Sequence, residues 1–354
     1  MSQTSQQTGS SCLISFGIPC YNSAAYMDHC IESILDTGLD PQEFEIVIVN
    51  DGSQKDNTPQ KADEWHERYP NNIKAVHQEN GGHGSAVLTG LEHADGMYYK
   101  VVDSDDWLDP VALKTLVNEI KDLLSKGITV DLFVANYVYE HVEDNTSHTV
   151  TYESVFPVNQ PFTWDEAKKF RVDQNLLMHA LTYRTSVLKE HAVPLPKHTF
   201  YVDNIYAWVP LPHCETLYYC NVDLYRYYIG RQDQSVNEKV MVSRYDQQHR
   251  ITRIMIDEYH LFEDVKSKNL LDYMLNYLTM MMVISTVFGY MSEVETSNDE
   301  VQELWDHLKE HDEKMYESIR HHHILGVLAN LPGSCGRAIT MAGYRVARKI
   351  FKFN

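Results

Sequence analysis

The chain has 354 residues, of which 43% are hydrophobic and 11% aromatic, so it is long and apolar enough to fold around a large core. Its formal net charge of −20 argues against nucleic acid as a partner, because a phosphate backbone needs a basic face. The six cysteines are scattered without paired spacing, which predicts reduced thiols in a cytoplasmic protein. Residues 1–11 are polar and rich in Ser and Gln, and we expect a disordered lead rather than a signal peptide.

The N-terminal part of the chain alternates apolar runs with polar loops. Residues 13–19 form an apolar run that ends at Pro19-Cys20-Tyr21-Asn22, and residues 24–35 then repeat apolar side chains at helical spacing. Residues 44–49 are a second apolar run, broken by Asn50-Asp51-Gly52-Ser53 before a polar helix. The pattern predicts a strand, a loop and a helix, repeated along the chain.

Two further runs continue the pattern. Residues 74–77 are a short third strand, followed by the Gly-rich segment 79–85 and a helix. Residues 98–102 are the fourth strand, which ends in three acids within the four residues 103–106. Four strands with helices between them predict an α/β fold with a mostly parallel sheet, and each loop lies at the carboxyl end of its strand, where such proteins bind ligands.

Side-chain packing does not explain the acidic segment, because its carboxylates repel one another. Mg²⁺ and Mn²⁺ prefer carboxylate oxygens and take their remaining ligands from the phosphates of a substrate. The segment therefore predicts a site for a metal and a diphosphate. The alternative is a solvated acidic turn before a helix that begins near Pro110, with Asp109 as its cap.

Four motifs in this order resemble those of family 2 glycosyltransferases of the GT-A fold, and the resemblance covers roughly residues 13 to 235. Each motif alone is weak, since an Asp-Gly-Ser or a Gly-rich loop is often only a turn. Their order and spacing make the assignment specific. The motifs are Pro19-x-Tyr21-Asn22, Val49-Asn50-Asp51-Gly52-Ser53 with Asp56 and Thr58, Asn80-Gly81-Gly82-x-Gly84 with Gly90, and Asp103-Ser104-Asp105-Asp106.

The resemblance implies a site for a nucleotide-sugar donor. Asp51 would contact uracil, although it could instead cap the turn that follows it. The Gly-rich loop would let backbone amides approach a phosphate. The helix after it would point its positive end at the same phosphate. The predicted donor-binding residues are Pro19, Tyr21, Asn22, Asp51, Asn80, Gly81, His83, Gly84, Lys100, Asp103, Ser104, Arg231, Gln234 and Ser235.

The cation and the positive charge near the donor come from the same segments. Asp105 would be the direct ligand of Mn²⁺ or Mg²⁺, with Asp103 facing the metal or the ribose, while Asp106 steadies the loop. The family often has an Arg where this chain has Val87-Leu88. His83 or Lys100 could supply that charge.

The catalytic base is expected on the acceptor side. Inverting transfer is a single displacement at the anomeric carbon, so one carboxylate must take the proton of the acceptor hydroxyl. The family usually has Glu-Asp at this point, and here Val202 replaces the Glu, which leaves Asp203 as the candidate. The alternative is that Asp203 only caps a helix. Arg231, with Gln234 and Ser235, would bind the diphosphate, unless Arg231 pairs with a local acid such as Asp233.

The C-terminal part reads as helical. Residues 273–292 carry no charge and are just long enough to span a bilayer of about 30 Å, but polar residues dilute them, which favours a buried helix. Residues 337–354 contain five basic and no acidic residues, and Ile339, Ala342, Val346, Ile350 and Phe353 share one helical face. This tail helix could lie on an anionic membrane surface or dock on the acidic body of the protein.

These features together predict a domain order and a function. We expect a lead over residues 1–11, a GT-A domain over 12–220, a donor-loop and helical region over 221–336, and the tail over 337–354. The resemblance implies a metal-dependent, inverting enzyme that moves a single sugar from UDP-hexose or UDP-N-acetylhexosamine to a bacterial cell-surface glycan or lipid-linked acceptor. We expect it in the cytoplasm, either free or at the inner face of the cell membrane. The processive Gln-x-x-Arg-Trp pattern is missing from the chain.

Two other classes of function stay open from the sequence. A catalytically silent nucleotide-sugar-binding module would keep Asp51 and Asp105 without needing Asp203. A sugar nucleotidyltransferase would normally have a basic Gly-rich loop after the first strand, and Cys20-Tyr21-Asn22-Ser23 is not such a loop.

Overall fold

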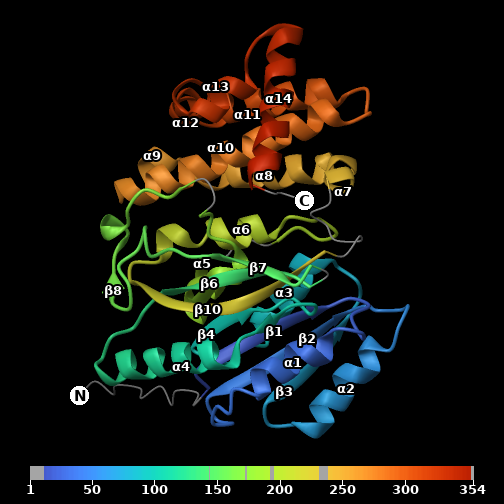
Figure 1. Ribbon diagram of the computed structural model, residues 1–354, viewed down its shortest axis with the longest axis vertical. Coiled ribbons are helices and arrows are strands. Elements are labelled where there is room, and N and C mark those ends of the chain that lie inside the picture. Colours follow the sequence, from blue (N-terminus) through green and yellow to red (C-terminus); the bar gives the residue numbers. More distant parts are fainter. Residues whose placement is uncertain (1–11, 143, 172–173, 192–194, 231–237, 352–354) are drawn as a thin grey trace, which may run out of the picture.

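The computed structural model of the protein describes residues 12–142, 144–171, 174–191, 195–230 and 238–351. An α/β layer lies at one end of the molecule and a group of helices at the other, with α6 between them (Figure 1). The lead predicted over residues 1–11 lies outside the described residues.

The strands of the α/β layer form one sheet of ten strands in the described part of the chain. They are β1 (Ile14–Cys20), β2 (Phe44–Asp51), β3 (Ile73–Gln78), β4 (Tyr98–Val101), β5 (Trp107–Leu108), β6 (Leu132–His141), β7 (Thr146–Val150), β8 (Pro161–Phe162), β9 (Leu181–Arg184) and β10 (Leu217–Ile229).

The helices that cover and extend the sheet begin and end as follows. They are α1 (Met27–Leu35), α2 (Thr58–Arg68), α3 (His83–Glu92), α4 (Pro110–Ser125), α5 (Thr185–His191), α6 (Asp203–Trp208), α7 (Glu238–Ser243), α8 (Tyr245–Glu258), α9 (Leu261–Asp264), α10 (Lys268–Met291), α11 (Ser297–His311), α12 (Glu313–Glu317), α13 (Ile324–Ala329) and α14 (Gly333–Phe351).

The sheet has the order β3-β2-β1-β4-β9-β6-β10-β5, with β7 paired to β6 and β8 to β10. β1 to β4 pair in parallel, which confirms the α/β prediction for this half. Strand β9 runs antiparallel to both β4 and β6, so the other half is mixed. Every residue of β1 and β2 is buried, because helices cover both faces of these apolar runs.

Strand β10 is the longest of the described strands. It pairs with β6 from Leu217 to Ile229, with register shifts between Cys220 and Tyr225. The domain boundary expected at residue 220 therefore falls inside β10, and the α/β part extends to at least Ile229. Tyr225, Tyr227 and Ile229 precede Gly230, so this stretch could be taken for a loop. Its pairing with β6 makes it part of the strand.

The helical region has α10 at its centre. This helix is long and apolar enough to cross a membrane, but 67% of its apolar window is buried inside the protein. α8, α11 and α13 pack against it. The buried helix predicted over residues 273–292 is thus found as the core of the helical region. The described cysteines are free thiols: Cys12, Cys20, Cys30, Cys214 and Cys220.

Candidate active site

The loops after β1 and β2 are fastened to each other at the carboxyl edge of the sheet. The backbone N–H of Asn22 donates to Oγ of Ser53 at 2.9 Å, and the N–H of Ser23 donates to Oγ1 of Thr58 at 2.7 Å. Oδ1 of Asn22 accepts from the N–H of Lys55 at 3.0 Å. The side chain of Asn22 is thus used by the protein, while Tyr21 is 51% exposed at the rim. Tyr21 is therefore accessible to a ligand as expected of a donor-binding residue.

Asp51 holds the Gly-rich loop in place. Its Oδ1 accepts from the N–H of Gly81 at 2.7 Å and from Nε2 of Gln78 at 2.7 Å, and its Oδ2 accepts from the N–H of Gly82 at 2.8 Å. Nδ2 of Asn80 donates to the carbonyl of Asp51 at 3.1 Å. Neither expected role, uracil contact or local turn cap, describes these contacts, which link two loops. Asp51 is only 2% exposed. Its contact with uracil stays a prediction.

The Gly-rich loop also receives the segment that precedes the predicted base. The N–H of His198 donates to the carbonyl of Gly81 at 2.7 Å. Gly82 has a φ of 84°, and a Cβ at this position would lie 3.0 Å from the backbone N of His198. Only glycine combines this conformation with so close an approach. The Gly-rich loop is thus in contact with the segment that leads to Asp203.

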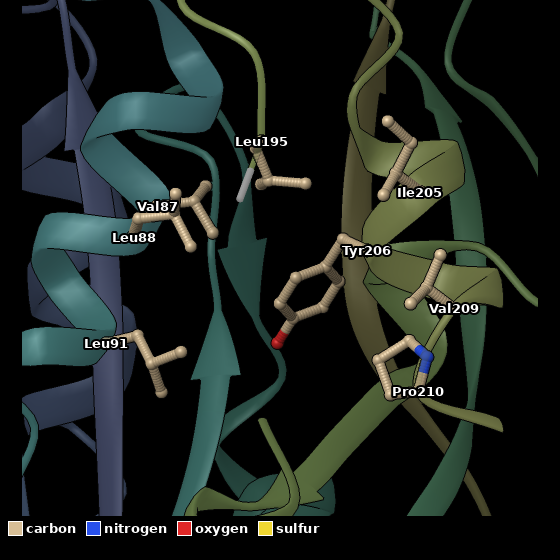
Figure 2. A pocket seen from close by; sticks show the side chains of 8 residues that line it. All are labelled: Val87, Leu88, Leu91, Leu195, Ile205, Tyr206, Val209 and Pro210. Atoms are coloured by element: carbon tan, nitrogen blue, oxygen red, sulfur yellow. The ribbon is translucent and has the colours of Figure 1, made fainter. Parts of the chain in front are cut away.

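A small apolar contact fixes α6, which begins at Asp203, against α3, which begins at His83. Figure 2 shows Val87, Leu88 and Leu91 of α3 facing Tyr206 across this contact. The cavity between them measures about 10 Å³, room for one water at most. The remaining lining residues are Leu195, Ile205, Val209 and Pro210.

His83 and Asp103 form an ion pair in the site. Nε2 of His83 lies 2.7 Å from Oδ1 of Asp103. Burial disfavours the imidazolium, but the charge and hydrogen bond of Asp103 raise the pKa of His83 overall. Burial likewise opposes ionisation of Asp103, but His83 lowers the pKa of this carboxyl. The pair therefore favours the charged form of each group, and the expected supply of positive charge to a donor by His83 stays a prediction.

Asp203 lies close enough to this pair to feel its charges. Burial raises the pKa of Asp203; His83 then lowers it, and Asp103 raises it. Asp203 is the first residue of α6, after Tyr201 with a φ of 66°. Its neighbour Asn204 accepts at Oδ1 from the hydroxyl of Tyr277 in α10 at 2.8 Å, which anchors the start of α6. Val202, at the N-cap, forms no side-chain cap bond, but the carboxyl of Asp203 accepts from backbone N–H groups of Asp203 and Asn204, which lowers its pKa, so the cap alternative for Asp203 stays open.

Asp106 is buried under the acidic loop. Its Oδ2 accepts from the hydroxyl of Tyr225 at 2.7 Å, and its Oδ1 accepts from the N–H of Tyr228 at 2.9 Å. The hydroxyl of Tyr225 also accepts from the N–H of Asp103 at 3.1 Å. Burial raises the pKa of Asp106 well above its usual range, and Asp105 and Asp103 raise it further. Asp106 thus steadies the loop, as the sequence predicts.

Lys100 is not placed as expected. It is fully buried, and its Nζ donates to the carbonyls of His179 at 2.8 Å and Leu181 at 3.3 Å. Burial lowers the pKa of Lys100 to about 7. The direct donor contact expected of Lys100 is therefore wrong for this structure: the side chain joins β4 to β9 instead, because strand pairing covers it.

The residues that could hold a cation include a histidine. One donor atom each of Asp103, Asp106 and His179 lie within 4.8 Å of one another. His179 is 7% exposed, and its Nδ1 has no hydrogen-bond partner in the described part of the chain. Burial lowers the pKa of His179 to about 4, so the ring is neutral and can donate a lone pair. The Asp103 carboxylate and a neutral imidazole offer ligands for Mn²⁺ or Mg²⁺, and Asp106 would join them on losing the proton that its raised pKa favours.

Asp105 lies in the same turn and is half-buried. It raises the pKa of Asp106, so its charge acts on the cluster. Its expected role as the direct metal ligand stays a prediction.

Ser104 is buried and donates from Oγ to Oγ of Ser23 at 2.8 Å, which joins the acidic loop to the loop after β1. Gly84 is buried, and a Cβ there would lie 2.8 Å from Cβ of Leu195.

The acidic-turn alternative is correct for one residue only. Oδ1 of Asp109 accepts from the N–H of Val111 at 3.1 Å and of Ala112 at 3.0 Å, so Asp109 caps α4. Asp103 and Asp106 have partners elsewhere and do not serve this cap. Three predicted donor residues, Arg231, Gln234 and Ser235, lie outside the described residues.

Residues 15–185 match the family model described as glycosyl transferase family 2. This chain contains a family 2 glycosyltransferase domain. The chain is similar to GlyG of Streptococcus pneumoniae serotype 4, with 33% identity over 141 residues, which cover 39% of this chain and 44% of that protein. It is also similar to the minor teichoic acid biosynthesis protein GgaB of Bacillus subtilis, with 33% identity over 105 residues, which cover 28% and 11%. The matches cover 34% and 30% of the length of two further curated relatives.

The fold of the glycosyltransferase is that of a solved structure. The S. aureus TarS structure of residues 1–349 in complex with UDP-GlcNAc superposes with a TM-score of 0.67 at 17% identity. The match covers 95% of this chain and 92% of that chain, so the helical region is included. The GT-A fold with a helical C-terminal region is thereby confirmed.

Two residues of this glycosyltransferase site could not be selected from the sequence. His179 lies in the segment Met178-His179-Ala180, which matches no motif. Tyr225 lies in a Tyr-rich stretch, and nothing in the sequence distinguishes it from the other tyrosines there. Their rings stack with centroids 4.6 Å apart beneath the acidic loop. Only the pairing of β4 with β9 and of β6 with β10 brings them there.

Proposed function

We propose that this glycosyltransferase moves one sugar, with inversion, from UDP-hexose or UDP-N-acetylhexosamine to a cell-surface glycan or lipid-linked acceptor. The observation that carries the proposal is the mutual influence of Asp203 and the His83–Asp103 pair on their pKa values. In this proposal Asp203 would act on the acceptor side and the His83–Asp103 pair on the donor side, and their mutual influence supports the proximity that a single displacement requires.

The donor end of the reaction uses the loops at the sheet edge. The imidazolium of His83 and the amides at the start of α3 favour the negative phosphates of the donor. A divalent cation, Mn²⁺ or Mg²⁺, held by Asp103 with Asp105 or Asp106 and His179, would stabilise the charge that develops on the departing UDP. The complex of TarS with UDP-GlcNAc supports a UDP-linked donor.

The acceptor end uses Asp203. The acceptor hydroxyl oxygen attacks the anomeric carbon, its proton passes to the carboxylate of Asp203, and the bond from that carbon to the diphosphate oxygen breaks. The electron pair of the broken bond leaves with UDP. A raised pKa makes Asp203 a better proton acceptor than an exposed Asp would be.

The acceptor class and the location follow from weaker support. GgaB is named as a minor teichoic acid biosynthesis protein, which supports a cell-surface glycan as the acceptor. We place the enzyme in the cytoplasm, at the inner face of the membrane, with the basic residues of the C-terminal tail toward anionic lipid.

Release of UDP tests the proposal. The protein is incubated with a panel of UDP- and GDP-linked sugars and a soluble acceptor analogue, with Mn²⁺, with Mg²⁺ and with a chelator. We expect turnover with a UDP-linked donor and a metal. Donor binding without turnover for every donor and acceptor would indicate a binding module, and turnover in chelator would remove the metal from the proposal.

A further inference from the structure

The short helix α13 carries its large apolar side chains on the outside. The residues that face the interior are the two small ones, Gly326 and Ala329. A Cβ on Gly326 would lie 1.8 Å from the carbonyl oxygen of Ile319, so the backbone of α13 packs directly on the preceding helical turn. Such packing needs small residues inside and leaves the larger ones outside.

The outward residues form one apolar surface, which we call the α13 patch. Thr340 of α14 donates from Oγ1 to the carbonyl of Leu328 at 2.8 Å, which places the neighbouring Ile339 beside α13. The members, with their exposed fractions, are Ile324 (75%), Leu325 (41%), Val327 (38%), Leu328 (40%) and Ile339 (51%). Figure 1 shows α13 and the start of α14 at the end of the molecule opposite the sheet.

Exposed apolar side chains in a cluster need an explanation. A single exposed Leu is ordinary, but neighbouring ones mark a surface that binds a partner or a membrane. Ile324, Val327 and Leu328 are spaced three and four residues apart, so they lie on one side of the helix.

The charge of the segment that carries the α13 patch indicates what binds there. Between Ser318 and Asn354 the sequence has six Arg and Lys residues, three His and no acid, in a chain whose net charge is −20. Arg337 and Arg345 are both exposed on α14. A basic segment that carries exposed apolar side chains fits a bilayer surface with anionic headgroups, while the acidic remainder of the chain is repelled from it.

Helix α14 docks on the body and still contributes to this surface. Its Met341 and Tyr344 pack against Val287 and Phe288 of α10, and the hydroxyl of Tyr344 donates to Oε2 of Glu238 at 3.0 Å. The opposite side, with Ile339 and Ala342, is exposed. Docking on the body therefore applies to one side of α14, and the exposed side is accessible to a membrane, as far as its side chains are described.

We propose that the α13 patch is a membrane-insertion surface, in which its apolar side chains enter the headgroup region of an anionic bilayer and the basic residues of α14 bind lipid phosphates. The inference rests on the proposed membrane location and is independent of Asp203 and of the donor. It assigns the apolar contact to α13, and to Ile339 beside it, rather than to the tail helix alone.

Vesicle binding by two matched pairs of variants tests this proposal. Ile324→Asp is compared with Val111→Asp, because both residues lie in the first turn of a helix and are 75% and 77% exposed. Arg345→Glu is compared with Arg253→Glu, because both arginines are exposed in the helical region. The probe is a vesicle of equal parts phosphatidylcholine and phosphatidylglycerol, with pure phosphatidylcholine as the neutral reference.

We expect the full chain to sediment with the anionic vesicles and to be released at about 1 M salt, where charges are screened within about 3 Å. Ile324→Asp and Arg345→Glu should each bind at least about fivefold more weakly. Both control variants should bind like the wild type. UDP release with a soluble acceptor should be unchanged in all four, which separates this inference from the proposed reaction.

Three outcomes would overturn the proposal. The first is a wild-type chain that stays in the supernatant with anionic vesicles. The second is Ile324→Asp that binds them as well as Val111→Asp does. The third is a wild-type dimer that Ile324→Asp converts to a monomer without a change in vesicle binding, because the patch would then join two copies of the chain.

Discussion

Nε2 of His83, the first residue of α3, lies 2.7 Å from Oδ1 of Asp103, in the acidic loop after β4. The ion pair joins the two loops expected to hold the phosphates and the cation. It also makes the charge of the donor site dependent on pH.

The first prediction concerns this pH dependence. Burial opposes protonation, but Asp103 raises the pKa of His83 above its ordinary value of 6.5, so the folded state binds the proton more tightly. The ion pair therefore stabilises the fold fully below pH 6.5, and this contribution is lost as the pH rises through the raised pKa. UDP affinity, measured by calorimetry, should fall over the same pH range. In His83→Gln the fall should vanish, whereas His93→Gln, which changes an exposed His, should keep it.

The second prediction concerns the cation. Asp105→Ala should lose Mn²⁺-dependent UDP binding by about tenfold or more and keep its fold, because removal of one carboxylate relieves repulsion in the cluster. Asp122→Ala, an exposed acid of α4, is the control. Titration of UDP with and without Mn²⁺ measures the effect. Unchanged affinity in Asp105→Ala would assign the cation to Asp103, Asp106 and His179 alone.

The third prediction concerns the base. Asp203→Asn should bind the donor like the wild type and transfer sugar about 10²-fold more slowly, the usual scale for a lost general base. Asp246→Asn, which changes an exposed acid in the first turn of α8, should transfer at the wild-type rate. The measurement is UDP release at saturating donor. A wild-type rate in Asp203→Asn would mean that another group takes the proton.

The fourth prediction concerns Tyr225. Its hydroxyl donates to Asp106 and accepts from the backbone of Asp103, so Tyr225→Phe leaves two buried polar groups without this partner. We expect a loss of about 1–3 kcal/mol in the free energy of unfolding, measured with urea. Tyr227→Phe, two residues along the same strand, is the control and should cost less. Equal losses would show that the hydrogen bonds of the Tyr225 hydroxyl contribute no more to stability than the hydroxyl of Tyr227 does.

The sequence by itself determined the local architecture. Apolar runs of strand length, each followed by a polar loop, predict β1 to β4, and parallel pairing brings the motif loops to one edge. The cap at Asp109 with Pro110 after it could also be read directly, because a cap depends on neighbours within one helical turn. These features depend on residues that are close in the chain.

The tertiary structure decided which distant groups meet. Lys100 is a charged residue in a short apolar run, and only its cover by β9 makes it a buried link rather than a donor contact. His179 and Tyr225 reach the acidic loop through strand pairings that span large parts of the chain, which no local periodicity encodes. In the same way the tail has one apolar stripe in sequence, but packing on α10 decides which side of α14 is covered and leaves Ile339 exposed beside α13. Burial and partners are properties of packed elements, so the sequence predicted the site's loops and the fold placed its buried residues.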